Sequence, residues 1–474
     1  MLCYTGHPLL DVGVATITAF VGKDDPTQVT TADMAEVAAY LERHYSHNPM
    51  KSFLTVIFPN SGFTQPAFDT QPAKRAAYAE YVLRAWHPDR PRLPEPCVFF
   101  GTPAVLRAYR EMIPLIGSES GFNFYAEGAA GLPVSGEALL AIHAMPIGAL
   151  KCAGRVLLFH AEHSPLTQDL AARALTINRG YLDLAAHQGG HTTKYHDAKH
   201  PTTQIVSMLL DAEQQRRDYA ACSITAYHLT NYGTNADISM YHLPLQMTRF
   251  LYQATDAMYR AAWNRLVQRA WVGDDAVPTH DTLGLPARRN TLFEDLFDLP
   301  ANAQRFLRTY LLRMPVVERT AKDDPRRTYS LVREVDYVSW PLTQLFLKEV
   351  MHVDERRIDA LRTMADQLAE YIQREEDHRL LRLLLYGGNS GKDYQELRTR
   401  LIRADYAAAR QTEPLFTLDQ FLTVFEYTDE RSWWMLARDL LLIRIIERLH
   451  DQKWFASNPN AIAPPTEMDE TATP

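Results

Sequence analysis

The sequence predicts an α+β protein, with a mixed N-terminal domain in residues 1–335 and a C-terminal helical bundle in residues 341–456. Three observations lead to this class. The chain has 474 residues, of which 46% are hydrophobic, as in folded proteins of two or three domains. Short apolar runs bounded by Gly, Pro or Asn are frequent in the first part. Beyond Pro341 these runs nearly vanish, and apolar residues recur at helical spacing.

The N-terminal domain combines strand-like runs with helical segments. Residues 30–45 predict a helix, because Met34, Val37 and Leu41 fall on one face after a threonine start. Four aliphatic and aromatic runs have the composition of strands, and they are residues 51–59, 97–101, 154–162 and 222–232. We therefore expect short β-sheets and helices joined by long irregular connections.

The C-terminal bundle is predicted from apolar stripes with a spacing of three and four residues. One stripe runs through residues 358–372 and another through residues 434–445. The segment YGGNSG at 386–391 separates two helices, and TLDQ at 417–420 has the pattern of a helix start. These signals predict a bundle of about four helices. The Pro-rich, acidic residues 457–474 predict a disordered tail.

Charge and apolar patterning exclude several classes of protein. The formal net charge is −8, which gives no global basic surface, so a nucleic-acid partner would meet local patches only. No apolar run is long enough to span a membrane, and the first twenty residues lack the basic start of a secretory signal. We therefore expect a cytoplasmic protein with no membrane partner.

The four cysteines predict neither a disulfide framework nor a zinc site. Cys3, Cys97, Cys152 and Cys222 are far apart in sequence and form no CxxC pair. Cys97 and Cys152 each lie in what resembles half of a zinc knuckle, and one cysteine from each cannot complete a tetrahedral set. We expect buried, reduced thiols and no cofactor.

The segment GGNSGKD at 387–393 has some features of a phosphate-binding loop. It is one residue too short, it follows a helix instead of a strand, and Asp393 stands where Ser or Thr would hold magnesium. The favoured interpretation is a turn that breaks one helix from the next.

A cluster of histidines is the strongest candidate for metal chemistry. His187, His191, His196 and His200 form two pairs with a spacing of four residues, which on helices would bring each pair to one face. The glycines at 189–190 disfavour a helix, and no HExxH glutamate or nearby cysteine completes a ligand set. The favoured interpretation is a solvated loop, and the alternative is a metal-dependent nuclease.

Three common motifs of enzymes are absent from the sequence. There is no G-x-S-x-G elbow, no pair of nuclease carboxylates at metal spacing and no dinucleotide-binding glycine fingerprint. Composition and motifs together favour a non-enzymatic binding or assembly protein.

Four segments give the chain a family resemblance. They are MLCYTGHPLLDVGVATITAF at the N-terminus, SFLTVIFPNSGFTQPAF at 52–68, GLPVSGEALLAIHAMPIGALKCAGRVL at 131–157 and YHLTNYGTNADISMYHLP at 227–244. In this order they resemble the large subunit of type I-B CRISPR Cascade, in its Cst-type branch. The likeness covers residues 1 to 250 and returns in the helical C-terminus, whereas residues 273–286 do not align.

The resemblance implies a non-catalytic subunit of an RNA-guided antiviral complex. Such a large subunit reads the protospacer-adjacent motif on double-stranded DNA, promotes R-loop formation and recruits the next effector, a helicase-nuclease or a transposition adaptor. Its other partners would be the guide RNA, the backbone and guide 5′-end-binding subunits, and the small subunit that the C-terminal bundle resembles. A scaffold that contacts only protein is a further alternative.

The polar tip of 227–244 is the first candidate DNA-binding site. Residues Ile224, Ala226, Ile238 and Met240 alternate as in a hairpin with one buried face, and Gly233 permits a tight connection. The tip carries three side chains that can donate and accept hydrogen bonds at a base edge, Asn231, Thr234 and Asn235. Asn60 and Gln65 form a weaker second loop, and the alternative interpretation is an ordinary exposed turn.

A row of arginines in the bundle is the second candidate site. On the predicted helix through residues 393–410, Arg400 and Arg403 lie one turn apart, and Arg410 lies about two turns further on. Under the resemblance this row would follow the phosphates of the displaced strand. The alternative is a solvated face on which Arg400 pairs with Glu396, one turn earlier.

Overall fold

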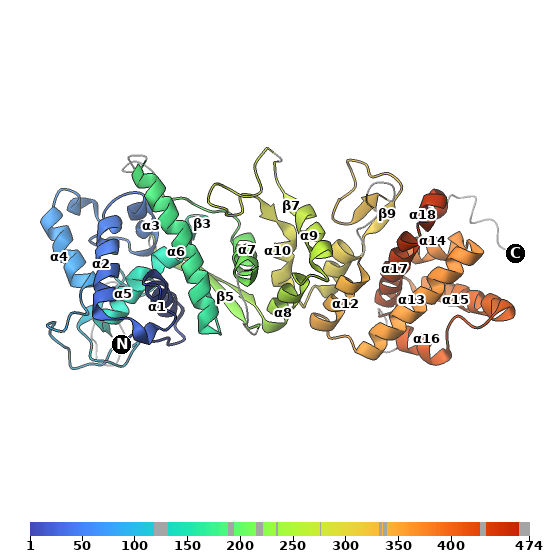
Figure 1. Ribbon diagram of the computed structural model, residues 1–474, viewed down its shortest axis with the longest axis horizontal. Coiled ribbons are helices and arrows are strands. Elements are labelled where there is room, and N and C mark those ends of the chain that lie inside the picture. Colours follow the sequence, from blue (N-terminus) through green and yellow to red (C-terminus); the bar gives the residue numbers. More distant parts are fainter. Residues whose placement is uncertain are drawn as a thin grey trace. The chain divides into compact units, whose positions relative to one another are not determined.

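The computed structural model describes residues 1–117, 131–187, 194–214, 221–233, 236–274, 276–330, 334, 339–426 and 433–463. Two compact units make up the chain (Figure 1). The first contains residues 1–248 and 272–293, and the second contains residues 249–271 and those from 294 onward. Helices and small sheets occur together in the first part and helices prevail near the C-terminus, which confirms the α+β class.

The first unit combines helices with a four-stranded antiparallel sheet and a separate antiparallel pair of strands, β1 (Leu106–Ala108) and β2 (Leu132–Val134). Its helices are α1 (Pro8–Phe20), α2 (Thr31–Tyr45), α3 (Met50–Ile57), α4 (Pro72–Leu83), α5 (Gly136–Ala144), α6 (Ser164–His187), α7 (Pro201–Gln214) and the start of α8 (Leu245–Ala254). Short 3-10 turns are η1 (Pro26–Gln28), η2 (Pro66–Phe68) and η3 (Met145–Gly148). The four-stranded sheet contains β3 (Leu150–Cys152), β4 (Arg155–Ala161), β5 (Ile224–Thr230) and β6 (Asp237–Leu243).

The main sheet has the antiparallel order β3-β4-β5-β6. One of its faces carries Val156, Leu158 and Leu229, which join the apolar core formed with α1 and α6. Helix α1 is buried from Leu9 to Thr18, as its almost unbroken apolar sequence requires. Close packing against α5 depends on Gly13, since a Cβ there would lie 1.9 Å from the Ala141 carbonyl oxygen.

Two of the four predicted strands are wrong and two are confirmed. Residues 154–162 and 222–232 contain β4 and β5, whereas residues 51–59 form most of α3. In α3 the buried side chains Met50, Phe53, Leu54 and Ile57 recur at helical spacing, and a short apolar run cannot distinguish that pattern from a buried strand. Residues 97–101 form a turn, closed by the Gly101 amide, which donates to the Cys97 carbonyl over 2.9 Å.

The hairpin β5–β6 is confirmed, but the expected buried face is wrong on β6. Ile224 and Ala226 are buried, whereas Ile238 and Met240 are 42% and 67% exposed. The register pairs Ile224 with Leu243 and Ala226 with Tyr241, so even-numbered residues of β5 share a face with odd-numbered residues of β6. The sequence does not fix this register, and a slip of one residue exchanges the two faces of a strand.

The second unit contains the helical bundle. Its helices are α9 (Arg260–Arg269), α11 (Ala303–Phe306), α12 (Trp340–Glu349), α13 (Glu355–Glu375), α14 (His378–Tyr386), α15 (Gly391–Gln411), α16 (Leu418–Phe425), α17 (Trp433–Asp451) and α18 (Trp454–Ser457). Shorter elements are η4 (Leu296–Asp298), the π-helical η5 (Leu307–Leu311), η6 (Pro459–Ile462), β9 (Met314–Val316) and β10 (Thr328–Ser330). The elements β7 (Trp271–Val272) and α10 (Thr291–Asp295) each span a boundary between the units in the sequence, and β8 (Arg289–Asn290) belongs to the first unit.

Both predicted apolar stripes are buried in the bundle. The stripe of α13 packs against α17, and every residue of the two stripes is buried. The predicted tail is partly wrong, because residues 458–462 pack on α14. There the Tyr386 hydroxyl donates to the Ile462 carbonyl over 2.6 Å, and Ala461 and Ile462 are buried. Residues 464–474 lie outside the described residues.

The division into units differs from the predicted boundary between residues 335 and 341. Residues 249–271 and 294–330, assigned to the N-terminal domain from the sequence, belong with the bundle. Aromatic contacts explain this: Phe250 meets Trp263 and Phe346 edge to face, and Phe306 stacks on Phe346 with a centroid distance of 5.1 Å. Within the described residues, no helix has both the length and the apolar character needed to cross a membrane.

Candidate nucleic-acid interface

Asn231, the first predicted reader of bases, is a buried structural residue. Its side chain is 0% exposed, and its Nδ2 donates to the carbonyls of Ile57 and Arg110 over 3.0 and 3.2 Å. Its Oδ1 accepts from Arg110 Nε over 3.2 Å and from the Leu115 amide over 3.4 Å. An asparagine amide has two donor hydrogens and two acceptor lone pairs, and all four are used here. The prediction that Asn231 faces a base edge is therefore corrected.

The described part of the tip presents a different side chain. Tyr232 is 62% exposed, and Gly233 has the positive φ of 78° that was predicted for the connection. Thr234 and Asn235 lie outside the described residues, so their role as base readers stays a prediction.

Asn231 also brings the two predicted loops to one place. Its backbone N–H donates to the Val56 carbonyl over 2.8 Å, at the C-terminal end of α3. The loop with Asn60 and Gln65 begins directly after that helix. Asn60 is exposed with a φ of 64°, and Gln65 is half-buried at the start of η2. The hydrogen bonds of Asn231 thus join the hairpin to the end of α3, and the exposed Asn60 follows that end in the chain.

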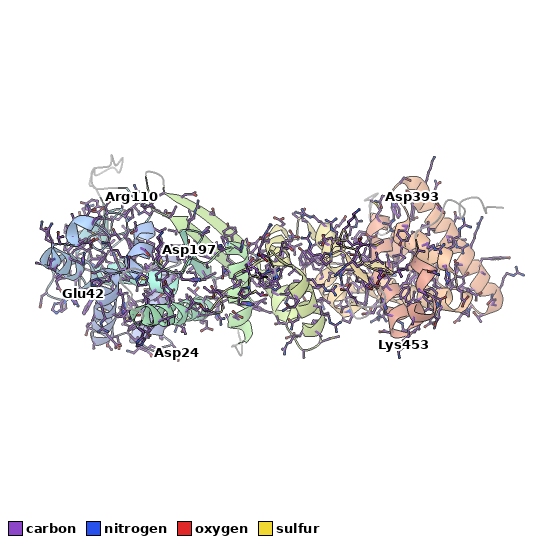
Figure 2. The ribbon with its side chains drawn as sticks, turned by 90° about the horizontal axis from the view of Figure 1, so that it is seen from above. Asp24, Glu42, Arg110, Asp197, Asp393 and Lys453 are labelled. Atoms are coloured by element: carbon purple, nitrogen blue, oxygen red, sulfur yellow. The ribbon has the colours of Figure 1, made fainter. Side chains whose placement is uncertain are left out.

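Arg110 holds this arrangement and was not predicted. Its Nη2 donates to the carbonyls of Asn231 and Gly233, each over 2.6 Å. Figure 2 labels Arg110. Within the described residues, no carboxylate forms an ion pair with this guanidinium. No sequence signal links Arg110 to residues more than a hundred positions away, because its partners are only two backbone carbonyls and the side chain of one asparagine.

The predicted helix that carries the arginine row is confirmed as α15, and Arg400 has a different ion-pair partner from the one expected. Arg400 Nη2 lies 2.5 and 2.6 Å from the two carboxylate oxygens of Asp377, and Asp377 is 7% exposed. Asp377 also caps α14 by accepting from the Leu380 amide over 3.0 Å. The expected alternative partner, Glu396, is therefore replaced by an acid at the start of the neighbouring helix. Arg400 is fixed in position by this pair.

A cleft with a basic lining lies beside Arg400, between α14 and α15. Its volume is about 330 Å³. The residues that line it are Arg379, Leu383, Lys392, Gln395, Glu396, Thr399, Arg400 and Arg403. Four of these carry positive charge and one carries negative charge. Arg379, Lys392 and Arg403 form no ion pair with any residue that the structure describes, so the cleft has a local excess of positive charge on an acidic chain.

The turn that precedes α15 is the predicted helix break, not a phosphate loop. Ser390 caps α15, and its hydroxyl and amide bond with Asp393 in a reciprocal capping box. Hydrogen bonding of the Asp393 carboxylate to the Ser390 hydroxyl and to the Ser390 backbone amide lowers the pKa of Asp393 (labelled in Figure 2). The carbonyls of Gly387 and Gly388 accept from Arg438 over 2.7 and 2.9 Å. The turn thus has a structural role, because it caps α15 and accepts hydrogen bonds from Arg438.

The histidine cluster does not converge in the described residues. His196 Nε2 lies 2.8 Å from Asp281 Oδ2, while His187 ends α6. His191 lies outside the described residues. No group of three or more His, Cys, Asp or Glu side chains that could hold a metal occurs in the part of the chain that the structure describes.

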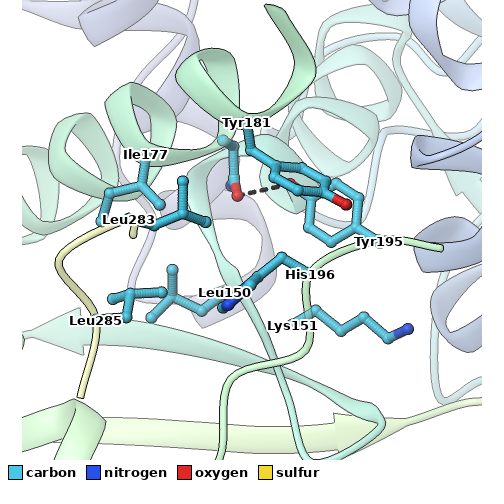
Figure 3. A pocket seen from close by; sticks show the side chains of 9 residues that line it. Leu150, Lys151, Ile177, Tyr181, Tyr195, His196, Leu283 and Leu285 are labelled. Carbon is cyan, nitrogen blue, oxygen red and sulfur yellow. Dashed lines mark hydrogen bonds between the residues drawn. The ribbon is translucent and has the colours of Figure 1, made fainter. Parts of the chain in front are cut away.

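The space next to His196 is too small for a substrate. Figure 3 shows Tyr181 and Tyr195 beside His196, with Leu283 on the other side. The cavity is about 10 Å³, enough for about one water molecule. The dashed line is the hydrogen bond from the Tyr195 hydroxyl to Asn178, at 2.6 Å. These contacts fix Tyr195 and His196 to α6 and to Asp281.

The cysteines are free thiols, as expected, with one difference in burial. Cys97, Cys152 and Cys222 are buried, whereas Cys3 is exposed. Desolvation raises the pKa of the Cys152 thiol to about 12. Cys152 is therefore an uncharged core residue at neutral pH.

Comparison with known proteins gives this chain no family. No protein-family model matches it, and no curated protein matches it in sequence. The case for a function therefore rests on the segment resemblance and on the two surfaces described above.

Proposed function

We propose that the chain is a non-catalytic large subunit of an RNA-guided surveillance complex of the type I-B Cascade kind, acting in the cytoplasm. In this role it recognises the adjacent motif on target double-stranded DNA, promotes R-loop formation and recruits a helicase-nuclease or a transposition adaptor. The guide RNA and its backbone, guide-end-binding and small subunits are its partners.

The observation that carries the proposal is the basic cleft between α14 and α15. Among the described residues, the lining holds four cations and the carboxylate of Glu396, and Asp377 pairs with one of the cations, Arg400, on a chain of net charge −8. Arg400 is held by a buried acid, whereas Arg379, Lys392 and Arg403 form no ion pair within the part of the chain that the structure describes. Exposed cations without acidic partners bind the phosphates of a nucleic-acid strand by displacing counterions, and such binding does not depend on sequence.

The salt dependence of binding tests this cleft. In the purified full-length chain, Lys392→Ala with Arg403→Ala removes two cations and leaves the Arg400–Asp377 pair intact. The slope of log K against log salt for single-stranded DNA should fall by about 1.4, at about 0.7 for each lost contact. Arg356→Ala is the matched control, because this exposed arginine pairs with Asp419 on another face of the bundle.

Two results would count against the cleft. An unchanged salt slope in the double variant would refute the phosphate contacts. An equal decrease of the slope in the Arg356→Ala control would show a general effect of charge. The metal-dependent nuclease has its own test: metal analysis and a cleavage assay on the isolated chain, both of which the present proposal expects to be negative.

A further inference from the structure

The outer face of α15 carries more than cations. Leu397, Leu401, Ala404 and Ala408 form the buried face of this helix. On the exposed side Arg403 and Arg410 are separated by seven residues, which is about 10 Å along the helix axis. Tyr406 lies between them and is 65% exposed. The helix thus presents an aromatic ring flanked by a cation one turn before it and another one turn after it.

Contacts with the described residues do not explain why a tyrosine stands at position 406. Its hydroxyl forms no hydrogen bond with any of them, and its one ring contact is with Arg410, whose guanidinium lies 6.0 Å from the ring centroid. The other tyrosine of α15 differs in this respect. Tyr394 packs on Trp434 with a centroid distance of 5.2 Å and bonds to Glu426. Packing therefore explains Tyr394 and does not explain Tyr406.

The acid that precedes Tyr406 in the sequence does not oppose a negatively charged ligand on this face. The Asp405 carboxylate accepts from the amides of Leu415 and Phe416 over 2.7 and 3.3 Å, in the loop that follows α15. It is engaged on a different side of the helix from Arg403 and Arg410. A strand of phosphates could lie along the two arginines without meeting this carboxylate.

We propose that Tyr406 is a stacking platform for an unpaired base of single-stranded DNA, whose phosphates contact Arg403 and Arg410. This inference rests on the proposed function, in which the same helix follows a displaced strand. An aromatic side chain stacks on any base, whereas bases in a duplex already stack on each other. The ring would therefore make the face selective for single strands, which cations alone do not achieve.

An abasic strand separates stacking from charge. The full-length chain is titrated into a fluorescein-labelled thymidine 20-mer and into a 20-mer of the same phosphates with abasic sites. Tyr406→Ala should weaken binding of the thymidine strand about tenfold, as expected for the loss of one stacked base. It should leave binding of the abasic strand unchanged, and Tyr406→Phe should bind both strands as the parent chain does.

The controls keep the result specific. Leu418→Ala removes another exposed apolar side chain, 73% exposed on α16, and should not affect either strand. An unchanged melting temperature of Tyr406→Ala establishes that the bundle is intact. Arg403→Ala should weaken binding of both strands equally, since both carry the same phosphates.

The outcomes distinguish this inference from the proposed function. If Arg403→Ala weakens binding while Tyr406→Ala has no effect on the thymidine strand, the stacking platform is wrong and the phosphate contacts remain. If Tyr406→Ala weakens both strands equally, stacking is also refuted. If neither variant changes binding, the phosphate contacts of the proposed function fail as well. Loss of a co-assembling subunit from Tyr406→Ala with unchanged DNA binding would make the face a protein interface and overturn the inference.

Discussion

Replacing Asn231 tests whether this residue supports the fold or reads bases. Asn231→Ala removes four side-chain hydrogen bonds, to Ile57, Leu115 and twice to Arg110. A hydrogen bond contributes about 1 kcal/mol net, and the buried partners left behind cannot all reach water. We expect a loss of about 3–4 kcal/mol in the free energy of unfolding.

Thermal unfolding of the full-length chain measures this loss. At about 2–4 °C per kcal/mol for a unit of this size, the transition of the first unit should fall by roughly 10 °C. Asn60→Ala is the matched control, because that asparagine is exposed, and its transition should stay within about 2 °C of the parent chain. A variant Asn231→Ala that melts like the parent chain and loses only discrimination between adjacent motifs would refute the structural role.

Three further predictions follow from buried contacts. His143 stacks on Phe58, and burial lowers its pKa to about 4 from the ordinary 6.5, so it is neutral at pH 7. The unfolded chain binds a proton at this histidine more readily than the folded chain does. The free energy of unfolding should therefore be greatest above pH 6.5 and fall by about 3 kcal/mol as the pH drops toward 4. Denaturant titrations at several pH values check this, and His143→Phe should flatten the dependence. Gly13→Ala places a Cβ against the carbonyl of α5 and should cost about 1–3 kcal/mol, measured by thermal unfolding, with an unchanged melting temperature contradicting the close approach. Asp377→Ala removes the cap of α14 and the partner of Arg400, so the bundle should lose about 2 kcal/mol or more by denaturant titration, whereas Arg356→Ala should lose under about 0.5.

Periodic patterns predicted the parts of the fold in which many residues act together. The stripes at 358–372 and 434–445 are buried because each repeats over several helical turns, and only a helix places such residues on one side. The run at 51–59 is too short to carry that information, and the helix there is selected by packing of Phe53 and Leu54 in the core.

Single contacts between residues far apart in the chain could not be predicted from the sequence. The composition of the tip suggested that Asn231 was available to a base, but Arg110 and the end of α3 satisfy its amide from elsewhere in the chain. The same applies to Arg400, whose partner was sought one turn away on its own helix and lies on α14. The positions of Arg403 and Arg410 on one exposed face needed only helical geometry, and the sequence supplied that.

The binding of target duplex by the assembled complex tests the central proposal most directly. The guide-loaded complex is purified with and without this chain, and its affinity is measured for duplexes with a correct or a scrambled adjacent motif and for a guide-complementary single strand. The proposal predicts that omission of the chain abolishes binding of the correct duplex and leaves binding of the single strand nearly intact. A complex that binds the correct duplex equally well without the chain would contradict the account.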